Sequence, residues 1–407
     1  MLQMNKNELL APAGDITKLK LAIKYGADGV YLGGRFGLRA SAAVKDDYLE
    51  EAVSYAHSHG KKIYVTVNIF ARNEDFNEIK IYLKRLEEIG VDAVIVSDLG
   101  VLRLVRKNTN LKIHISTQAN VLNKYTAEEY TELGASRIIL ARECSLTEIK
   151  EIAAHLKNRC NIEVFVHGAM CVSYSGRCLI SNYMTSREAN RGECTQPCRY
   201  KYTGSFAAGS LIEEKRPSEH WDIEEDAHGT YVMNSKDLCL INHLDELADC
   251  GVSSFKIEGR MKSDYYVAAT VNTYRRVLDG ENFDYIKEID KIPHRPWTTG
   301  FVFKNNDNLF IDHSKQISTH EVVGKCLTSE GYQGYEKILQ RNVFCVGDEL
   351  EILSPGKNHN MTFKVLSIKD EQGQNVTRAN KAGAVYFIEP DNGLVFEFDE
   401  FLRKRIF

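Results

Sequence analysis

A phrase that recurs four times in the first part of the chain constrains its fold more than any other feature. YGADGVYLG at 25–33 is echoed by IGVDAVIVSD at 89–98, by LGASRIILAR at 133–142 and by CGVSSFKIEGR at 250–260. Each copy joins the end of a helical stretch, a glycine that can cap that helix, a short loop and an unbroken apolar run. Unbroken apolar strands are typical of a parallel sheet, because both faces of such a sheet are buried.

Further strands and helices are expected between these copies. The apolar strands lie at 8–12, 62–68, 112–118 and 162–168, and helical stretches with 3.6-residue apolar spacing include 47–58, 77–89 and 127–133. The total is eight strand–helix units, so we predict a TIM (β/α)8 barrel over residues 1–290. A doubly wound open sheet is the alternative. The chain has no Gly-x-Gly-x-x-Gly after its first strand, which removes the most common use of that alternative fold.

The pattern changes after the barrel. Residues 291–320 include KIPHRPWTTGF, which has two prolines, and we predict a linker there. Short strands then alternate with turn residues from 321 to 407, at EVVGKCL, EKILQRN, GDELEIL, MTFKVLSI, GAVYFIE and LVFEFD. Short strands punctuated in this way predict a small all-β C-terminal domain, a barrel or a sandwich.

The composition places the chain in an ordinary globular class. Its 407 residues carry a formal net charge of −4, which gives no overall basic signal for nucleic acid, and we expect no DNA partner. No apolar run approaches the roughly 18–20 residues that cross a bilayer. The first residues also lack the apolar core of a signal peptide. We therefore expect a cytoplasmic protein with no membrane partner.

The chain has ten cysteines, and four of them are clustered. In a reducing compartment structural disulfides are rare, so clustered cysteines favour a metal or catalysis. Cys171, Cys178, Cys194 and Cys198 fall within 28 residues, at the start of a long insertion (169–235) that follows the seventh predicted strand. Active sites of barrel enzymes lie at the C-terminal ends of strands, and loops of this length are usually functional.

The spacing of these cysteines favours an iron–sulfur cluster over zinc. Structural zinc sites generally use two Cys-x(2–4)-Cys knuckles, and only the pair Cys194 and Cys198 has that form. We predict a [4Fe–4S] cluster, with zinc as the alternative, on Cys171, Cys178 and Cys194. The fourth ligand is either Cys198 or Cys239 in SKDLC, and the sequence leaves both open.

Polar residues stand at the ends of the predicted barrel strands and should converge at the same mouth. They are Asn68, Asp98, Gln118, Arg142, Glu143, His167, Lys256, Glu258 and Arg260. A role as a helix N-cap or first-turn acid is simpler for Asp98 and Glu143. A charge inside a barrel is costly unless it is paired or used, which draws attention to Lys256 and Glu258, two residues apart in the last strand.

We assign roles to six of these residues. His167, Lys256, Glu258 and Arg260 are candidate catalytic residues, and Arg142 and Gln118 are candidate cofactor-binding residues. Arg260 is the best candidate for a carboxylate or phosphate contact, because a guanidinium binds either group through two hydrogen bonds.

Residues 177–201 carry a local basic signal. This segment has five basic residues against two acidic ones, interleaved with Tyr183 and Tyr200. Basic residues with aromatics can hold a nucleic-acid backbone and stack a flipped base. The alternative is a solvated basic loop around a cluster.

The residues around the first two clustered cysteines resemble a known signature. EVFVHGAMCVSYSGRCLIS at 163–181 is similar to that of the collagenase-like peptidase family, peptidase family U32. Other matching phrases are ELLAPAG at 8–14, GADGVYLGG at 26–34, SKDL at 235–238 and KIEGRMKS at 256–263. The resemblance extends over the whole barrel, and the β-rich tail resembles the family's C-terminal domain.

The resemblance implies a function that the residues alone do not. Better understood members of the family are oxygen-independent hydroxylases of tRNA, of rRNA or in ubiquinone biosynthesis, and they are linked to iron–sulfur clusters and prephenate. One barrel with a C-terminal β-domain is most similar to the branch that hydroxylates the tRNA wobble uridine. The resemblance thus implies an enzyme that forms 5-hydroxyuridine, with tRNA as partner and prephenate as co-substrate. A paralogous family member or a reductant protein is a further possible partner.

Two other functions stay open at this point. The family name makes a collagenase-like peptidase the first alternative. The chain has no Gly-x-Ser-x-Gly elbow, and His320-Glu321 lacks the second histidine of His-Glu-x-x-His. A nucleophilic pair of Cys171 with His167 would be needed instead. The second alternative is a non-catalytic, cluster-bearing RNA-binding protein.

Overall fold

The computed structural model describes most of the chain. The described residues are 7–38, 46–171, 173–174, 177–191, 193–199, 210–212, 220–222, 225–226, 229–230, 235–303, 316–328 and 334–406. The chain divides into two compact units, one formed by 1–23, 27–261 and 295–316 and the other by 24–26, 262–294 and 317–407. Residues 262–290, which the sequence analysis assigns to the barrel domain, thus cluster with the C-terminal strands. No helix among the described residues is long and apolar enough to span a membrane.

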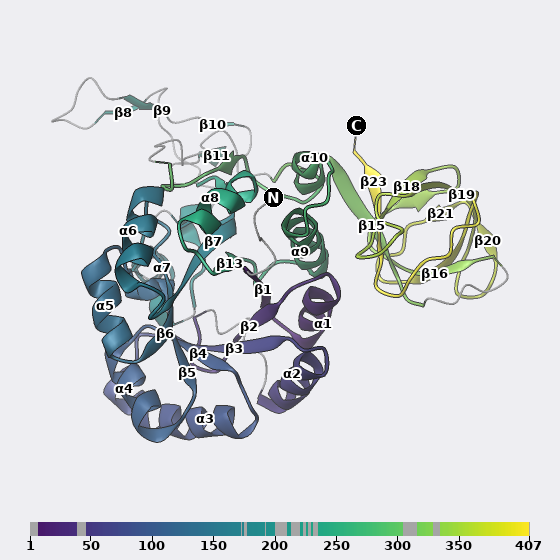
Figure 1. The fold of residues 1–407 in the computed structure, drawn as a ribbon. Helices are drawn as coiled ribbons and strands as arrows, with labels where there is room; N and C mark the ends of the chain where they lie inside the picture. Colours follow the sequence, from purple (N-terminus) through teal and green to yellow (C-terminus); the bar gives the residue numbers. More distant parts are fainter. Residues whose placement is uncertain are drawn as a thin grey trace. The chain divides into compact units, whose positions relative to one another are not determined.

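The first unit is built on a ring of eight parallel strands with helices outside it (Figure 1). The strands are β1 (Glu8–Ala13), β2 (Gly29–Gly33), β3 (Lys62–Val67), β4 (Ala93–Val96), β5 (Lys112–Ile115), β6 (Ala135–Ile139), β7 (Asn161–Ala169) and β13 (Ser254–Ile257). Each pairs in parallel with the next, and β13 pairs with both β7 and β1, which closes the ring. The predicted TIM barrel is confirmed.

Amphipathic helices connect the barrel strands. They are α1 (Ile16–Lys24), α2 (Asp46–Ser58), α3 (Phe76–Glu88), α4 (Leu99–Asn108), α5 (Lys124–Glu132), α6 (Leu146–Leu156) and α8 (Leu244–Asp249). The helix after the last barrel strand, α9 (Asp264–Leu278), belongs to the second unit. The Asp98 carboxylate accepts a hydrogen bond from the third backbone amide of α4, so its expected role as an N-cap is confirmed. The expected role of Glu143 as a helix cap is wrong, because Ser145 caps α6 and Glu148 completes the capping box.

The insertion after β7 returns to the barrel through a short strand. It contains α7 (Ile180–Thr185) and two short ladders, β8 (Ser210–Ile212) with β9 (His220–Asp222) and β10 (Glu225–Asp226) with β11 (Gly229–Thr230). β12 (Asp237–Cys239) then pairs antiparallel with the end of β7, and β14 (Trp297–Thr298) pairs with β12. The predicted linker therefore contributes a strand to the barrel sheet. The three residues of β12, within SKDLC, are too few to show an alternating pattern of apolar residues.

The second unit contains a closed antiparallel β-barrel. Its strands are β15 (His320–Cys326), β16 (Glu336–Gln340), β18 (Glu349–Leu353), β19 (Thr362–Lys369), β22 (Val385–Pro390) and β23 (Phe401–Arg405). The order is β18-β23-β15-β16-β22-β19, and β19 pairs with β18 to close the ring. Short strands β17 (Phe344–Cys345), β20 (Asn375–Val376) and β21 (Arg378–Ala379) pair at its margins. The predicted all-β C-terminal domain is confirmed.

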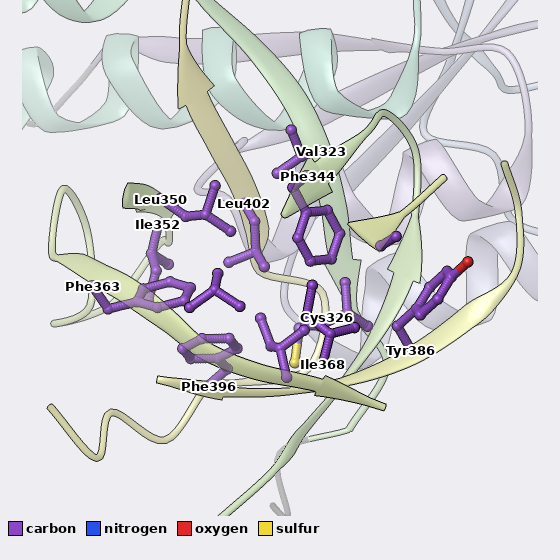
Figure 2. Close-up of a cluster of buried hydrophobic side chains, with 14 residues drawn as sticks. Val323, Cys326, Phe344, Leu350, Ile352, Phe363, Ile368, Tyr386, Phe396 and Leu402 are labelled. Atoms are coloured by element: carbon purple, nitrogen blue, oxygen red, sulfur yellow. The ribbon is translucent and has the colours of Figure 1, made fainter. Parts of the chain in front are cut away.

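One predicted strand of this domain is wrong, although its apolar residues are used. LVFEFD (394–399) is not a strand; β23 follows it instead. Phe396 is nevertheless fully buried in the domain core, beside Phe363, Leu402 and Cys326 (Figure 2). The apolar spacing of this segment thus reflects packing of single side chains rather than a hydrogen-bonded ladder. The fully buried Cys326 packs as a small apolar residue.

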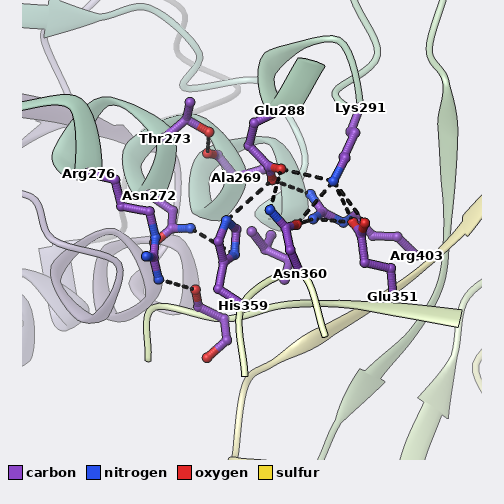
Figure 3. Close-up of polar contacts among 12 residues, drawn as sticks. Ala269, Asn272, Thr273, Arg276, Glu288, Lys291, Glu351, His359, Asn360 and Arg403 are labelled. Atoms are coloured by element: carbon purple, nitrogen blue, oxygen red, sulfur yellow. Dashed lines mark hydrogen bonds and ion pairs between the residues drawn. The ribbon is translucent and has the colours of Figure 1, made fainter. Parts of the chain in front are cut away.

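A buried polar network also stabilises the second unit (Figure 3). The Arg403 guanidinium is fully buried and contacts Glu288 at 2.7 Å, Asn360 at 2.6 Å and Glu351 at 2.5 Å. Lys291 lies 3.0 Å from Glu288 and 2.8 Å from Glu351. Glu288 belongs to α10 (Tyr285–Ile289). Burial would raise the pKa of Glu288, but Arg403 and Lys291 outweigh it and hold that pKa well below its usual range.

Candidate functional site

A cavity of about 140 Å³ opens among the later halves of the barrel strands and the loops that follow them. Its lining residues are Tyr31, Leu38, Thr66, Asn68, Ile95, Ser116, Thr117, Gln118, Ile139, Arg142, Phe165, Cys171, Tyr174, Cys178, Ala189, Cys194, Lys256, Glu258 and Arg260. This end of the barrel is where active sites of the fold lie. Most of the residues that the sequence singles out thus meet in one place, among them three cysteines and three cations.

Three of the five candidate cluster ligands line this cavity. Cys171 and Cys194 are exposed and Cys178 is partly exposed. Cys198 and Cys239 are partly exposed and are not among the described lining residues. Cys239 lies in β12, opposite His167 of β7. Among the described residues no three cysteine, histidine or acidic side chains are close enough together to hold a metal ion. The three thiols at the cavity are of the chemical type that binds iron–sulfur clusters or zinc, but the structure does not gather them into a formed metal site.

Ion pairs hold the part of the insertion that carries Cys171, Cys178 and Cys194, here called the cysteine segment, against the barrel. Arg191, three residues before Cys194, contacts the two carboxylate oxygens of Asp75 at 2.8 and 3.0 Å and donates to the Phe70 carbonyl. Arg72 in turn contacts Glu188 at 2.6 Å. The hydrogen bond from Arg191 lowers the pKa of Asp75 to about 2, so this carboxylate is charged at any physiological pH. These contacts hold Glu188 and Arg191 of the cysteine segment against the loop between β3 and α3.

Arg142 connects the end of β7 to the end of β13. Its guanidinium donates to the Ala169 carbonyl at 2.7 Å, lies 3.4 Å from a Glu258 carboxylate oxygen and stacks on the Phe165 ring with its centre 4.0 Å away. Ala169 precedes Cys171 by two residues. Arg142 therefore positions the start of the insertion while one face of its side chain borders the cavity.

Arg260 borders the cavity from the loop after β13. It donates to the Thr66 hydroxyl at 3.3 Å and to the Leu38 carbonyl, and it lies 5.8 Å from the centre of the Tyr31 ring. The loop is packed closely against the first strand: a Cβ at Gly14 would lie 2.3 Å from the Arg260 carbonyl oxygen. Only glycine leaves room for this approach.

Lys256 reaches the cavity from a buried layer of charges inside the barrel. Its ammonium lies 2.8 Å from one oxygen of Glu163, whose other oxygen contacts Arg137 at 3.0 Å and the Ser254 hydroxyl at 3.1 Å. Arg137 also pairs with Glu8, at the start of β1. Two carboxylates and two cations thus balance across the barrel. Sequence reasoning missed Glu8, Arg137 and Glu163; the signal was a charged residue inside each of three otherwise apolar strands.

Gln118 and Arg142 each present a buried donor at the cavity that has no acceptor among the described residues. Gln118 is 3% exposed and accepts a hydrogen bond from Ser116, but its amide nitrogen has no partner among the described residues. The Nε of Arg142 is likewise without a hydrogen-bond partner there. A buried donor without an acceptor is rare in proteins and indicates a place for a water or a ligand oxygen.

The His167 side chain does not line the cavity with the other candidate catalytic residues, although its backbone carbonyl accepts a hydrogen bond from the Glu258 amide at 2.9 Å. It is almost fully buried, its ring centre lies 5.2 Å from that of Trp297, and it is not among the described residues that line the cavity. By strict alternation it would face the same side as Phe165, which does line the cavity. The pairing of β7 with β13 is irregular between Phe165 and His167, and this shift separates the two side chains.

Comparison with known proteins identifies the family. A family model described as Peptidase family U32 matches residues 14–311, and a model for the C-terminal domain of that family matches 318–398. The chain belongs to peptidase family U32. The family resemblance of the sequence motifs is thereby confirmed.

Three relatives show how far the similarity extends. The chain is 38% identical to tRNA hydroxylation protein P1 of Bacillus subtilis, over 92% of this chain and 89% of that protein. It is 37% identical to tRNA hydroxylation protein P of Escherichia coli, over 89% of each. An uncharacterized protease of Methanocaldococcus jannaschii is 42% identical over 73% of each chain. These names agree with the prediction that the chain is an enzyme.

Proposed function

We propose that this protein hydroxylates the wobble uridine of tRNA to 5-hydroxyuridine, in an oxygen-independent reaction that depends on an iron–sulfur cluster and uses prephenate. The observation that carries the proposal is the similarity to two tRNA hydroxylation proteins over about nine-tenths of the chain. The cavity supports the proposal, because three cysteines and three cationic side chains of this chain line it, at the usual position of a barrel active site.

The cysteines would hold the cluster at the cavity mouth. Cys171, Cys178 and Cys194 would be three ligands, and Cys198 or Cys239 the fourth, with zinc as the alternative metal. A bound cluster would supply electron transfer or an open iron site for an oxygen donor. The pairing of Arg191 with Asp75 keeps the Cys194 side of the segment at the barrel rim before any cluster binds.

The cavity's polar groups suit an anionic co-substrate. Arg142 and Arg260 offer guanidinium groups to a carboxylate, and Gln118 offers an amide donor. Lys256 and Glu258 would donate or accept protons at the same wall of the cavity, where the low dielectric strengthens their electrostatic interactions with a bound ligand. Prephenate carries two carboxylates and therefore matches this set of donors.

The RNA would approach over the cysteine segment. Arg177 and Arg187 are exposed there, and Tyr174 lines the cavity between the first two cluster cysteines. Cations can contact phosphates while an aromatic ring stacks a base that has left its helix. A cytoplasmic enzyme acting on tRNA would also need an electron donor, either a reductant protein or a paralogous family member.

The test is the modification state of tRNA from a strain that lacks the gene. Mass spectrometry of its nucleosides should show loss of 5-hydroxyuridine, restored by the wild-type gene and not by one encoding Cys171→Ala. A wobble uridine that is unchanged by the deletion would overturn the proposal. Binding of tRNA by the purified protein without any turnover would instead indicate a non-catalytic RNA-binding protein.

A collagenase-like peptidase is the second candidate, favoured by the family name and by the relative described as a protease. Such an enzyme would pair Cys171, which lines the cavity, with His167, whose ring lies against Trp297 and is not among the described lining residues. We therefore expect purified, metal-replete protein to leave gelatin and peptides intact. Cleavage that is lost in Cys171→Ala would favour the peptidase.

A further inference from the structure

Lys256 is a buried amine at the wall of a cavity. Its side chain is 4% exposed, and its nitrogen lies over the Tyr31 ring, 4.3 Å from the ring centre, and 5.4 Å from the centre of the Phe165 ring. Burial lowers its pKa; Glu163 and Glu258 oppose this effect, and Arg137 adds to it. Desolvated lysines near other cations are the lysines that act as nucleophiles toward carbonyl groups.

The same cavity offers donors for a carboxylate. Gln118 and Arg142 each present a buried nitrogen that has no hydrogen-bond partner in the described part of the chain, and both residues line the cavity together with Lys256. A carboxylate has acceptor oxygens for both donors, and a guanidinium is its best partner. A carbonyl next to that carboxylate would lie in the cavity that Lys256 borders.

We propose that Lys256 forms a Schiff base with a small 2-oxo carboxylic acid whose carboxylate binds Arg142 and Gln118. Prephenate contains a 2-oxo acid group, so the inference rests on the proposed function for the identity of the natural ligand. The amine chemistry itself depends on neither RNA nor a cluster.

Glu163 makes the step possible without any outside reagent. Its Oε1, 2.8 Å from the Lys256 nitrogen, takes the ammonium proton. The neutral amine then adds to the ketone carbon and a C–N bond forms. The carbonyl oxygen leaves as water with the two remaining amine protons, and the proton on Glu163 returns to the imine nitrogen. One ammonium and one ketone thus give one protonated imine and one water, with no change in oxidation state.

The layer beneath Lys256 keeps Glu163 in place for this exchange. The second carboxylate oxygen of Glu163 accepts hydrogen bonds from Arg137 at 3.0 Å and from the Ser254 hydroxyl at 3.1 Å, and the Glu163 side chain has no solvent exposure. Water therefore does not compete for the transferred proton on this side of the lysine. This assigns Glu163, to which the sequence analysis gave no role, as the proton acceptor of the step.

The test is reductive trapping on the full-length protein. Incubation with pyruvate and sodium borohydride should add a single group with the mass of pyruvate less one oxygen atom, and peptide mapping should place it on Lys256. Lys256→Arg, which keeps a buried cation but has no primary amine, should abolish the adduct. Arg142→Ala should raise the pyruvate concentration for half-maximal labelling at least about tenfold, the loss of one charge-assisted hydrogen bond.

The chain offers a matched control. Lys325 is also buried, lies 2.7 Å from Asp399 and stacks on Phe401 at 5.4 Å, but it belongs to the other unit. Lys325→Met should therefore leave the labelling unchanged. The inference is overturned if wild-type protein forms no adduct, if the label spreads over several lysines, or if Lys256→Arg is labelled like wild type. If Lys256 is labelled but the tRNA of the source organism carries no 5-hydroxyuridine, the proposed function is overturned and the inference about Lys256 stands.

Discussion

Removing Arg403 from the second unit should be strongly destabilising. Arg403→Met keeps most of the side-chain volume but leaves two carboxylates, Glu288 and Glu351, around the single cation Lys291. Breaking a buried ion pair from one side costs about 3–5 kcal/mol. Lys291 and Asn360 still contact Glu288, at 3.0 and 3.1 Å, so the lower end, about 3 kcal/mol, is expected.

Hydrogen exchange of the full-length protein can measure this loss locally. Each 1.4 kcal/mol is a tenfold change in a population, so backbone amides of β18 and β23 should exchange about two orders of magnitude faster in the variant. Lys287→Ala on the same helix is the control. Lys287 pairs with Asp284 in full contact with solvent, and its removal should leave exchange unchanged.

The pH dependence identifies the cause as charge. In the wild-type protein the pKa of Glu288 is lowered, so its stabilising contribution is complete above the pKa of an unfolded glutamate and is lost as the pH falls through the native pKa. Without Arg403 the uncompensated carboxylate instead favours protonation. The difference between variant and wild type should therefore shrink from about pH 7 to about pH 4. A difference of the same size at both pH values would refute this reasoning and point to lost packing.

Three further predictions concern the first unit. Cys171→Ala should remove iron and visible absorption from anaerobically purified protein, whereas Cys250→Ala, outside the cavity, should retain both; equal iron in the two variants would contradict the ligand assignment. Asp98→Ala removes the N-cap of α4 and should lower the free energy of unfolding by about 1 kcal/mol in a denaturant titration. Gly14→Ala would place a Cβ 2.3 Å from the Arg260 carbonyl oxygen and should cost about 1–3 kcal/mol in the same titration; no change would show that the loop yields freely.

The barrel could be predicted from the sequence because its strands are buried on both faces. An unbroken apolar run after a glycine cap, such as GVYLG, is typical of a buried parallel strand, and its fourfold recurrence in this chain makes a chance match improbable. In the barrel sheet the strands that escaped prediction are the short ones, β12 and β14, whose pairing depends on partners far away in the chain. The false strand at 394–399 failed for the opposite reason, since Phe396 is apolar for packing alone.

The candidate site could be predicted only in part. Residues at strand ends, such as Gln118, Lys256 and Arg260, follow directly from the strand assignment. The position of His167 could not, because it depends on a local irregularity in the pairing of β7 with β13. Glu163 was hidden for another reason: its charge is balanced by Arg137, which comes from a different strand and a different part of the sequence.

The antiparallel pairing of β12 with β7 has a consequence for how this enzyme can change in length. Because Asp237 pairs with Ala169, both ends of the insertion are hydrogen-bonded to the same barrel strand. The chain between them is a closed loop, and doubling the length of such a loop costs only about 0.6 kcal/mol of entropy. Residues could thus be gained or lost within the insertion, during evolution or by engineering, while the barrel strands keep their register.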